Sequence, residues 1–204
     1  KVLRGPITSE SAAIFRVDHD RREATRLNHS ATHILHAALR EFLGEEVHQA
    51  GSLVTADRLR FDFTYGSRVE TEKLVVIEDW VNARVRENVA VSSTEMAFDD
   101  AVAAGALAFF GDKYGDQVRV LKMGDFSVEL CGGTHVSRTG DIGLFKIGAE
   151  SAVGAGVRRI EAVTGAVALS QVRVREEEIR RLSALLKTDE RELGPRIEKM
   201  LAQQ

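Results

Sequence analysis

The sequence predicts an α+β fold, in which a largely antiparallel sheet packs with helices and a C-terminal helical extension follows. Long segments with apolar residues at helical spacing are mixed with short segments that alternate between apolar and polar residues. Because several of the short segments follow one another directly, separated by glycine turns, the pattern favours an α+β domain.

The first predicted helix begins after Asp18 or Asp20, either of which can cap its N-terminus, and ends at Gly44. The apolar residues of this segment recur at helical spacing and form one stripe, made of Leu27, Ala31, Ile34, Leu35, Ala38 and Phe42. Further helices are predicted for residues 69–88, 98–110 and 167–186.

The predicted strands are short and mostly lie in the second half of the chain. They cover residues 13–17, 59–65, 118–121, 127–130, 143–147 and 158–163. Residues 111–115 are predicted to form a loop, and Gly194-Pro195 is predicted to interrupt the C-terminal helical region before a last turn. From Gly165 onward the sequence changes to a charged segment with a helical pattern. We interpret Gly165 as the boundary between a compact domain and a helical linker.

Composition limits the class of protein. The 204 residues carry a formal net charge of −3, with 44% hydrophobic and 29% charged residues, which is ordinary for a globular chain and excludes a disordered tail or a fibrous repeat. No apolar run approaches the ~20 residues of a membrane helix. A single cysteine favours a reducing compartment, so we expect a cytoplasmic protein. The chain begins with Lys1 and shows no signal peptide, and we expect it to be a fragment of a longer protein.

Two short segments carry side chains suited to metal binding. His29 and His33 are four residues apart on the first helix, so they lie on one helical face, roughly opposite the apolar stripe. Cys131 and His135 flank a Gly-Gly-Thr turn directly after a predicted strand. Three imidazoles and one thiolate make a complete tetrahedral set of nitrogen and sulfur ligands, which favours Zn²⁺ over hard cations.

The alternatives to a zinc site differ in strength. A histidine pair at helical spacing is, by itself, usually incidental, but two such pairs together indicate a metal site. A zinc metalloprotease helix has a glutamate directly after its first histidine, as the general base. Here that position is Ser30, which excludes a metalloprotease.

The combination of His29-x-x-x-His33 with Cys131-x-x-x-His135 resembles the editing domain of alanyl-tRNA synthetases. The same motif pair occurs in free-standing editing proteins and in the editing domain of threonyl-tRNA synthetases. Surrounding segments strengthen the resemblance to the alanyl type: RLNHSATH (26–33), HQAGSL (48–53), LRFDF (59–63), GDKYG (111–115), ELCGGTH (129–135), TGDIG (139–143) and GVRRIE (156–161). The resemblance covers residues 1–165 and implies an editing domain there, with residues 166–204 as a linker toward a C-terminal domain.

The resemblance implies proofreading, namely hydrolysis of the ester that joins serine or glycine to alanine-specific tRNA. It also implies zinc as the cofactor. The implied partners are alanine-specific tRNA and the rest of the synthetase chain. A second site is chemically necessary, because a pocket built for alanine rejects an analogue with an added hydroxyl only about a hundredfold. A site that hydrogen-bonds the hydroxyl discriminates by about 10⁴ or more.

Three residues are candidates for contact with the substrate side chain. Ser30 and Thr32 flank the histidine ligands on the helix, although such hydroxyls often bond the helix carbonyl four residues earlier instead. Gln49 belongs to the pocket by resemblance, and it can equally cap a loop.

Candidate tRNA contacts are Gly132, Gly133, Arg158 and Arg159. At most one of the two arginines can face the site, because neighbours on a strand point to opposite faces.

The resemblance leaves the role of zinc open. Four protein ligands are typical of a structural site, whereas catalysis requires a further coordination position. The alternative to a hydrolase is therefore a structural-zinc module that binds tRNA or a partner.

Overall fold

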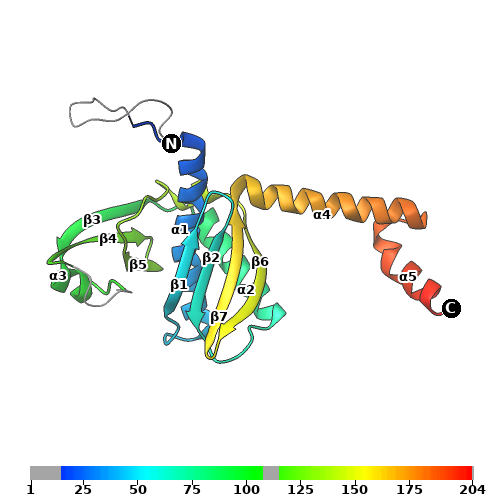
Figure 1. Cartoon of the computed structure of the whole chain (residues 1–204), viewed down its shortest axis with the longest axis horizontal. Coiled ribbons are helices and arrows are strands. Elements are labelled where there is room, and N and C mark those ends of the chain that lie inside the picture. Colours follow the sequence, from blue (N-terminus) through cyan, green and yellow to red (C-terminus); the bar gives the residue numbers. More distant parts are fainter. Residues whose placement is uncertain (1–14, 108–114, 204) are drawn as a thin grey trace, which may run out of the picture.

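The structure is a computed structural model that describes residues 15–107 and 115–203. It confirms the α+β class, but the strands divide between two antiparallel sheets instead of forming one (Figure 1). The four-stranded sheet has the order β1-β2-β7-β6, with β1 at Gln49–Val54, β2 at Leu59–Thr64, β6 at Phe145–Gly154 and β7 at Val157–Thr164. The three-stranded sheet has the order β3-β4-β5, with β3 at Val91–Ala97, β4 at Gln117–Met123 and β5 at Ser127–Leu130.

Helix α1 (His19–Leu43) lies between the two sheets and contacts strands of both (Figure 1). The side chain of Asp18 caps it by accepting a hydrogen bond from the backbone N–H of Arg21 at 3.1 Å, and Gly44 follows its last residue. Both predicted ends are therefore confirmed. Because α1 has a sheet on either side, the face opposite its apolar stripe is also largely covered, and this face carries the predicted ligands.

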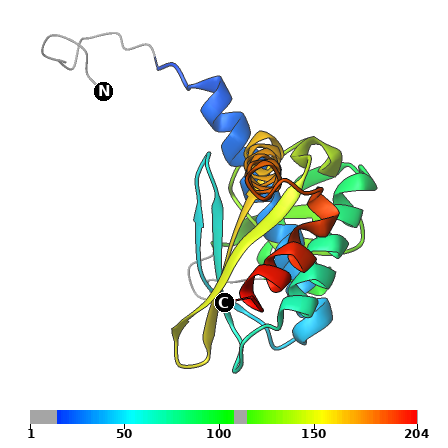
Figure 2. The same ribbon diagram turned by 90° about the vertical axis from the view of Figure 1, so that its right-hand side faces the viewer.

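The main core forms where α1 and α2 (Thr71–Arg86) cover one face of the four-stranded sheet (Figure 2). Phe61 and Phe63 of β2 point into it with Phe145 of β6, and all three are essentially fully buried. A smaller apolar cluster lies between α3 (Phe98–Ala103) and the second sheet, and includes Ala101, Val120 and Leu130. The main core also includes Leu121 and Met123 of β4 and so reaches the second sheet, whereas the smaller cluster holds α3 against that sheet.

Several element predictions were wrong in detail. Residues 13 and 14 lie outside the described part, and Phe15 to Val17 form no strand. Helix α3 ends at Ala103, because Gly105 adopts a positive φ of 80°. Residues 108–110 of that predicted helix and residues 111–114 of the predicted loop lie outside the described part. Strands β1 and β3 were not predicted, and β6 extends to Gly154, well beyond its predicted end.

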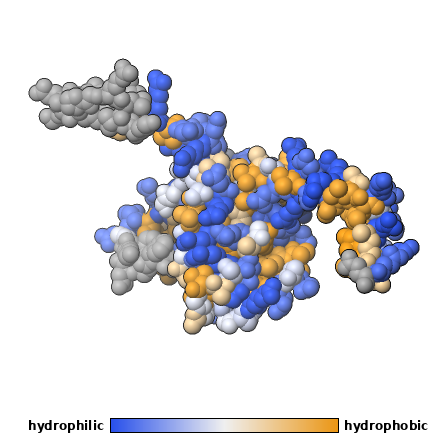
Figure 3. All heavy atoms as spheres, turned by 45° about the vertical axis from the view of Figure 1, so that its right-hand side comes forward, coloured by the Kyte–Doolittle hydropathy of each residue, from blue (hydrophilic) through white to orange (hydrophobic). Residues whose placement is uncertain are grey.

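The C-terminal region is helical, as predicted. Helix α4 (Gly165–Leu186) projects away from the sheets, and hydrophobic atoms mark parts of its surface and of the last helix (Figures 1 and 3). The break comes at Lys187, which has a left-handed φ of 50°, and α5 spans Leu193–Leu201. Gly194-Pro195 therefore lies in the first turn of α5, where proline is tolerated, and the predicted interruption there was wrong. None of the helices in the described ranges combines the length and apolar character needed to span a membrane.

Asn82 of α2 ties this helix to β6. Its Nδ2 donates to the backbone carbonyl of Phe145 at 2.9 Å, and its Oδ1 accepts from the N–H of the same residue at 3.0 Å. Asn82→Ala is expected to lower the free energy of unfolding by about 1–3 kcal/mol, since two backbone groups lose their partner. Urea denaturation measures this change. Val76→Ala, at a half-exposed site on the same helix, is the control and should shift it by no more than about 0.5 kcal/mol.

Candidate metal centre

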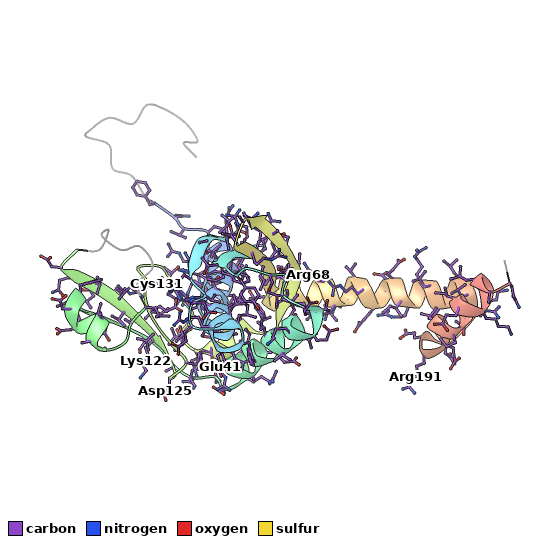
Figure 4. The ribbon with its side chains drawn as sticks, turned by 90° about the horizontal axis from the view of Figure 1, so that it is seen from below. Glu41, Arg68, Lys122, Asp125, Cys131 and Arg191 are labelled. Atoms are coloured by element: carbon purple, nitrogen blue, oxygen red, sulfur yellow. The ribbon has the colours of Figure 1, made fainter. Side chains whose placement is uncertain are left out.

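Two elements that are far apart in the sequence bring the four predicted ligands together. Helix α1 carries His29 and His33, and the loop after β5 carries Cys131 and His135. One nitrogen or sulfur atom from each residue lies within 4.8 Å of the corresponding atom of every other. Cys131, labelled in Figure 4, lies where the three-stranded sheet meets α1. We call these four residues the His/Cys cluster.

The three imidazoles of the cluster are oriented alike. The Sγ atom of Cys131 lies 3.6 Å from Nε2 of His29 and 3.2 Å from Nε2 of His135. The Nε2 atom of buried His33 makes no hydrogen bond within the described ranges. Each Nδ1 atom instead faces a protein oxygen: His29 that of the Thr134 carbonyl at 3.2 Å, His33 the Glu129 carboxylate, and His135 the Ser30 hydroxyl at 3.3 Å. All three rings thus have Nε2 available for a metal.

The protonation states of the cluster suit a metal. Burial opposes ionisation of the Cys131 thiol, but hydrogen bonds from His135 and His29 and the nearby charge of His33 outweigh it and lower its pKa to about 3. Burial also lowers the pKa of His135 to about 4. The pKa of His33 is raised despite its burial, because the Glu129 carboxylate stabilises the imidazolium. A metal therefore meets a thiolate and a neutral His135, and it must displace a proton from His33.

The donor set fits zinc. Thiolate and imidazole are the ligands that Zn²⁺ prefers, and four of them make a closed tetrahedral set. The outer contacts fit as well, because histidine ligands of zinc usually donate their second ring N–H to a carboxylate, a carbonyl or a water. The His/Cys cluster is a candidate metal centre on these grounds.

The loop between Cys131 and His135 is held by its backbone carbonyls. Three side chains each engage one of them: Arg119 binds the carbonyl of Gly133, His29 that of Thr134, and Arg26 that of His135. The Nε–O distance for Arg26 is 2.7 Å. Neither arginine was predicted to bind the loop, because nothing in the local sequence marks an arginine as a partner of backbone carbonyls 14 or 109 residues away.

Gly133 allows the loop to approach α1. A Cβ atom at this position would lie only 2.2 Å from Cε1 of His29, whereas a Cβ at Gly132 would meet nothing within 4 Å. The two glycines, both predicted as substrate contacts, therefore differ: Gly133 is required for the contact between loop and helix, and Gly132 is exposed.

The hydroxyls of Ser30 and Thr32 both have partners inside the protein. Ser30 Oγ accepts from the N–H of Val136 at 3.1 Å and lies beside Nδ1 of His135. Thr32 donates to the carbonyl of Asn28 at 2.9 Å, which is the helix back-bond considered above. Contact of either hydroxyl with a substrate stays a prediction, and Ser30 in addition orients the ring of His135.

Gln49 is half-buried at the beginning of β1. It is paired in register with Phe63, so it lies on the sheet face that packs against α1. The described contacts do not join its amide to the His/Cys cluster. Its place in a substrate pocket stays a prediction.

Arg158 and Arg159 are engaged in ion pairs. Arg158 binds Glu150 at 2.6 Å, and Arg159 makes two hydrogen bonds with Asp62, at 2.7 and 2.8 Å. Strand register places Arg158 opposite Phe63 and Arg159 opposite Asp62, so the two point to opposite faces of the sheet. Hydrogen bonding to Arg159 lowers the pKa of Asp62. Neither arginine contacts the His/Cys cluster in the described structure, and tRNA binding by either stays a prediction.

Comparison with known proteins agrees with this geometry. A family described as the threonyl and alanyl tRNA synthetase second additional domain matches residues 118–161, which include Cys131 and His135. An alanine–tRNA ligase of Pseudomonas fluorescens is 54% identical over 187 residues, 91% of this chain and 21% of the relative. One of Nitrosomonas eutropha is 50% identical over 197 residues, 97% of this chain and 23% of the relative. The chain thus spans about a fifth of the length of these curated relatives. Over nearly its whole length the chain is thus similar to alanine–tRNA ligases, and its residues 118–161 match the second additional domain.

Proposed function

We propose that this chain is a proofreading hydrolase, which cleaves the ester between serine or glycine and alanine-specific tRNA. The observation that carries the proposal is the His/Cys cluster, in a chain whose relatives are alanine–tRNA ligases. The partners are then the mischarged 3′ end of that tRNA and the remainder of a ligase chain, in the cytoplasm.

Zinc is the proposed cofactor, held by His29, His33, Cys131 and His135. When bound, it supplies a Lewis acid and an anchor for substrate or water. The protein contributes the rest: the carbonyl contacts of Arg26 and Arg119 fix the loop, Gly133 lets it approach α1, and Gly132 leaves its outer side free of bulk. A positively charged guanidinium at the loop also suits the phosphates of an RNA terminus, and Arg119 has no carboxylate partner in the described structure.

The alternative is a structural-zinc module that binds tRNA without chemistry. Two observations favour it. Four protein ligands complete a tetrahedron, and the hydroxyls of Ser30 and Thr32 are already hydrogen-bonded inside the protein. A hydrolytic site requires either a further coordination position on zinc or a ligand that moves aside.

The two proposals predict different rates of serine release from seryl-tRNA. Seryl-tRNA and alanyl-tRNA, both made on alanine-specific tRNA, are incubated with the zinc-loaded chain and with the full-length ligase that contains it. We expect rapid release of serine, with a preference over alanine that reaches about 10⁴, because only serine satisfies a hydroxyl-binding group. Chelation of the metal should abolish the release, and added zinc should restore it. If neither protein releases serine while zinc is bound at one equivalent, the site is structural.

A further inference from the structure

Glu129 is a buried carboxylate beside the His/Cys cluster. It is 2% exposed and lies in β5, two residues before Cys131. Side chains two apart on a strand share a face, so Ser127, Glu129 and Cys131 all point toward α1. Val128 and Leu130 point the other way, into the smaller apolar cluster. One strand therefore delivers a ligand and a carboxylate to the same face of α1.

The carboxylate has three partners. One oxygen binds Nδ1 of His33; the other lies 3.1 Å from Nδ1 of His36 and 3.4 Å from the Ser127 hydroxyl, which donates to it. The pair with His33 excludes water almost completely, since the two side chains are 9% and 3% exposed. Such a pair has a fixed geometry, because neither partner can exchange the other for a hydrogen bond to water.

Glu129 is the partner that makes His33 different from the other two histidines. When Nε2 binds a metal, the Nδ1–H groups of His29 and His135 donate to neutral oxygens, whereas that of His33 donates to an anion. A carboxylate acceptor holds the proton on Nδ1, directs Nε2 toward the cluster and makes that nitrogen a stronger donor to a metal. It also balances charge: a divalent cation bound by one thiolate retains one positive charge, which a single carboxylate neutralises.

We infer that Glu129 is the positioning residue of the metal centre, which orients His33 and neutralises the bound cation through it. The inference rests on the proposed metal centre. It goes beyond the four ligands to a group that raises the affinity of the site for the metal. Glu129 does not itself coordinate, because its oxygens face Nδ1 of His33 and of His36, on the side away from Nε2.

The experiment compares Glu129→Gln with Glu41→Gln in the full chain. Glu41 is an exposed carboxylate of α1, labelled in Figure 4, that lines the same 320 Å³ surface cavity as Glu129, so both variants lose one negative charge at a common cavity. Zinc dissociation constants come from competition with a chromophoric chelator. Co²⁺ in place of zinc reports ligand geometry through its visible absorption. Thermal unfolding of the metal-free forms reports folding.

Glu129→Gln is expected to weaken zinc binding about 10–100-fold and to change the Co²⁺ spectrum, whereas Glu41→Gln leaves both unaltered. Zinc affinity equal to that of the unaltered chain, with an unchanged Co²⁺ spectrum, would overturn the inference. If Glu129→Gln fails to fold, Glu129→Asp decides by the same criteria, since it keeps the charge but withdraws the oxygens from His33. An unaltered chain that binds no zinc would refute the metal centre and the inference together. A Glu129→Gln variant that releases serine at the normal rate and binds zinc as tightly as the unaltered chain would refute the inference alone.

Discussion

Cys131→Ala is expected to stop the release of serine from mischarged tRNA and to leave the chain with weakly held zinc. The substitution removes the only thiolate of the cluster, whose Sγ atom lies within 3.6 Å of two ligand nitrogens. Losing an outer contact of a metal site costs about 10–100-fold, so losing a ligand should cost more than about 100-fold in affinity. When zinc is limiting, the deacylation rate should fall at least in proportion to the loss of bound zinc.

The measurement pairs metal content with single-turnover deacylation at fixed zinc. Ser137→Ala, at an exposed position two residues beyond the loop, serves as the matched control and should behave like the unaltered chain. At saturating zinc, three imidazoles can still hold the metal with an open position. A Cys131→Ala variant that contains no zinc and yet hydrolyses seryl-tRNA at the normal rate would contradict a role for the metal in the chemistry.

The second large effect is expected for Gly133→Ala. The added methyl group would lie 2.2 Å from Cε1 and 2.8 Å from Nδ1 of His29, closer than carbon atoms approach in proteins. Because His29 is held by the Thr134 carbonyl and by Cys131, either the ring or the loop must move. A displacement of about 1 Å in a catalytic site costs about 100-fold in rate, and we expect a loss of that order in deacylation.

Gly132→Ala is the matched control, since it makes the same chemical change one residue earlier, where the added methyl group meets open space. It should leave zinc affinity and the stability of the fold unchanged within about twofold. Rates of deacylation and zinc affinities of the two variants are compared at the same metal concentration. A Gly133→Ala variant that binds zinc and deacylates like the unaltered chain would show that the close approach of loop and helix is not needed.

The sequence predicted that these four side chains come together, and the structure shows that they do, because each pair is a local pattern. Spacing along a helix places His29 and His33 on one face, and a short glycine turn keeps Cys131 and His135 together. That these two pairs meet depends on how β5 packs against α1, which spacing alone does not determine. The resemblance supplied that step.

Glu129 was missed for a physical reason. In a strand that alternates polar and apolar residues, the polar face usually meets solvent, and the segment 127–130 has this pattern. Here the polar face meets α1 instead, because this helix has a sheet on either side. A sequence does not state which neighbour covers a strand, so a buried carboxylate was indistinguishable from an exposed one.

Strands β1 and β3 were missed because their own residues favour strands weakly. Gln49–Val54 contains glycine and serine, and Val91–Ala97 contains two serines; both lie at the edge of a sheet. Their pairing with β2 and β4 supplies the order that local propensity does not. Similarly, the split into two sheets depends on pairing between β2 and β7, which lie far apart in the chain.

The distance in sequence between the two halves of the cluster also governs when it can form in a cell. His29 and Cys131 are 102 residues apart, and chains grow at about 5–20 residues per second. The histidine pair on α1 therefore leaves the ribosome about 5–20 s before the loop that completes the site. During that interval two imidazoles alone would bind a metal weakly and without selectivity. Loading of the proposed metal centre would thus be a late event of biosynthesis, because the centre is complete only after the second sheet has folded.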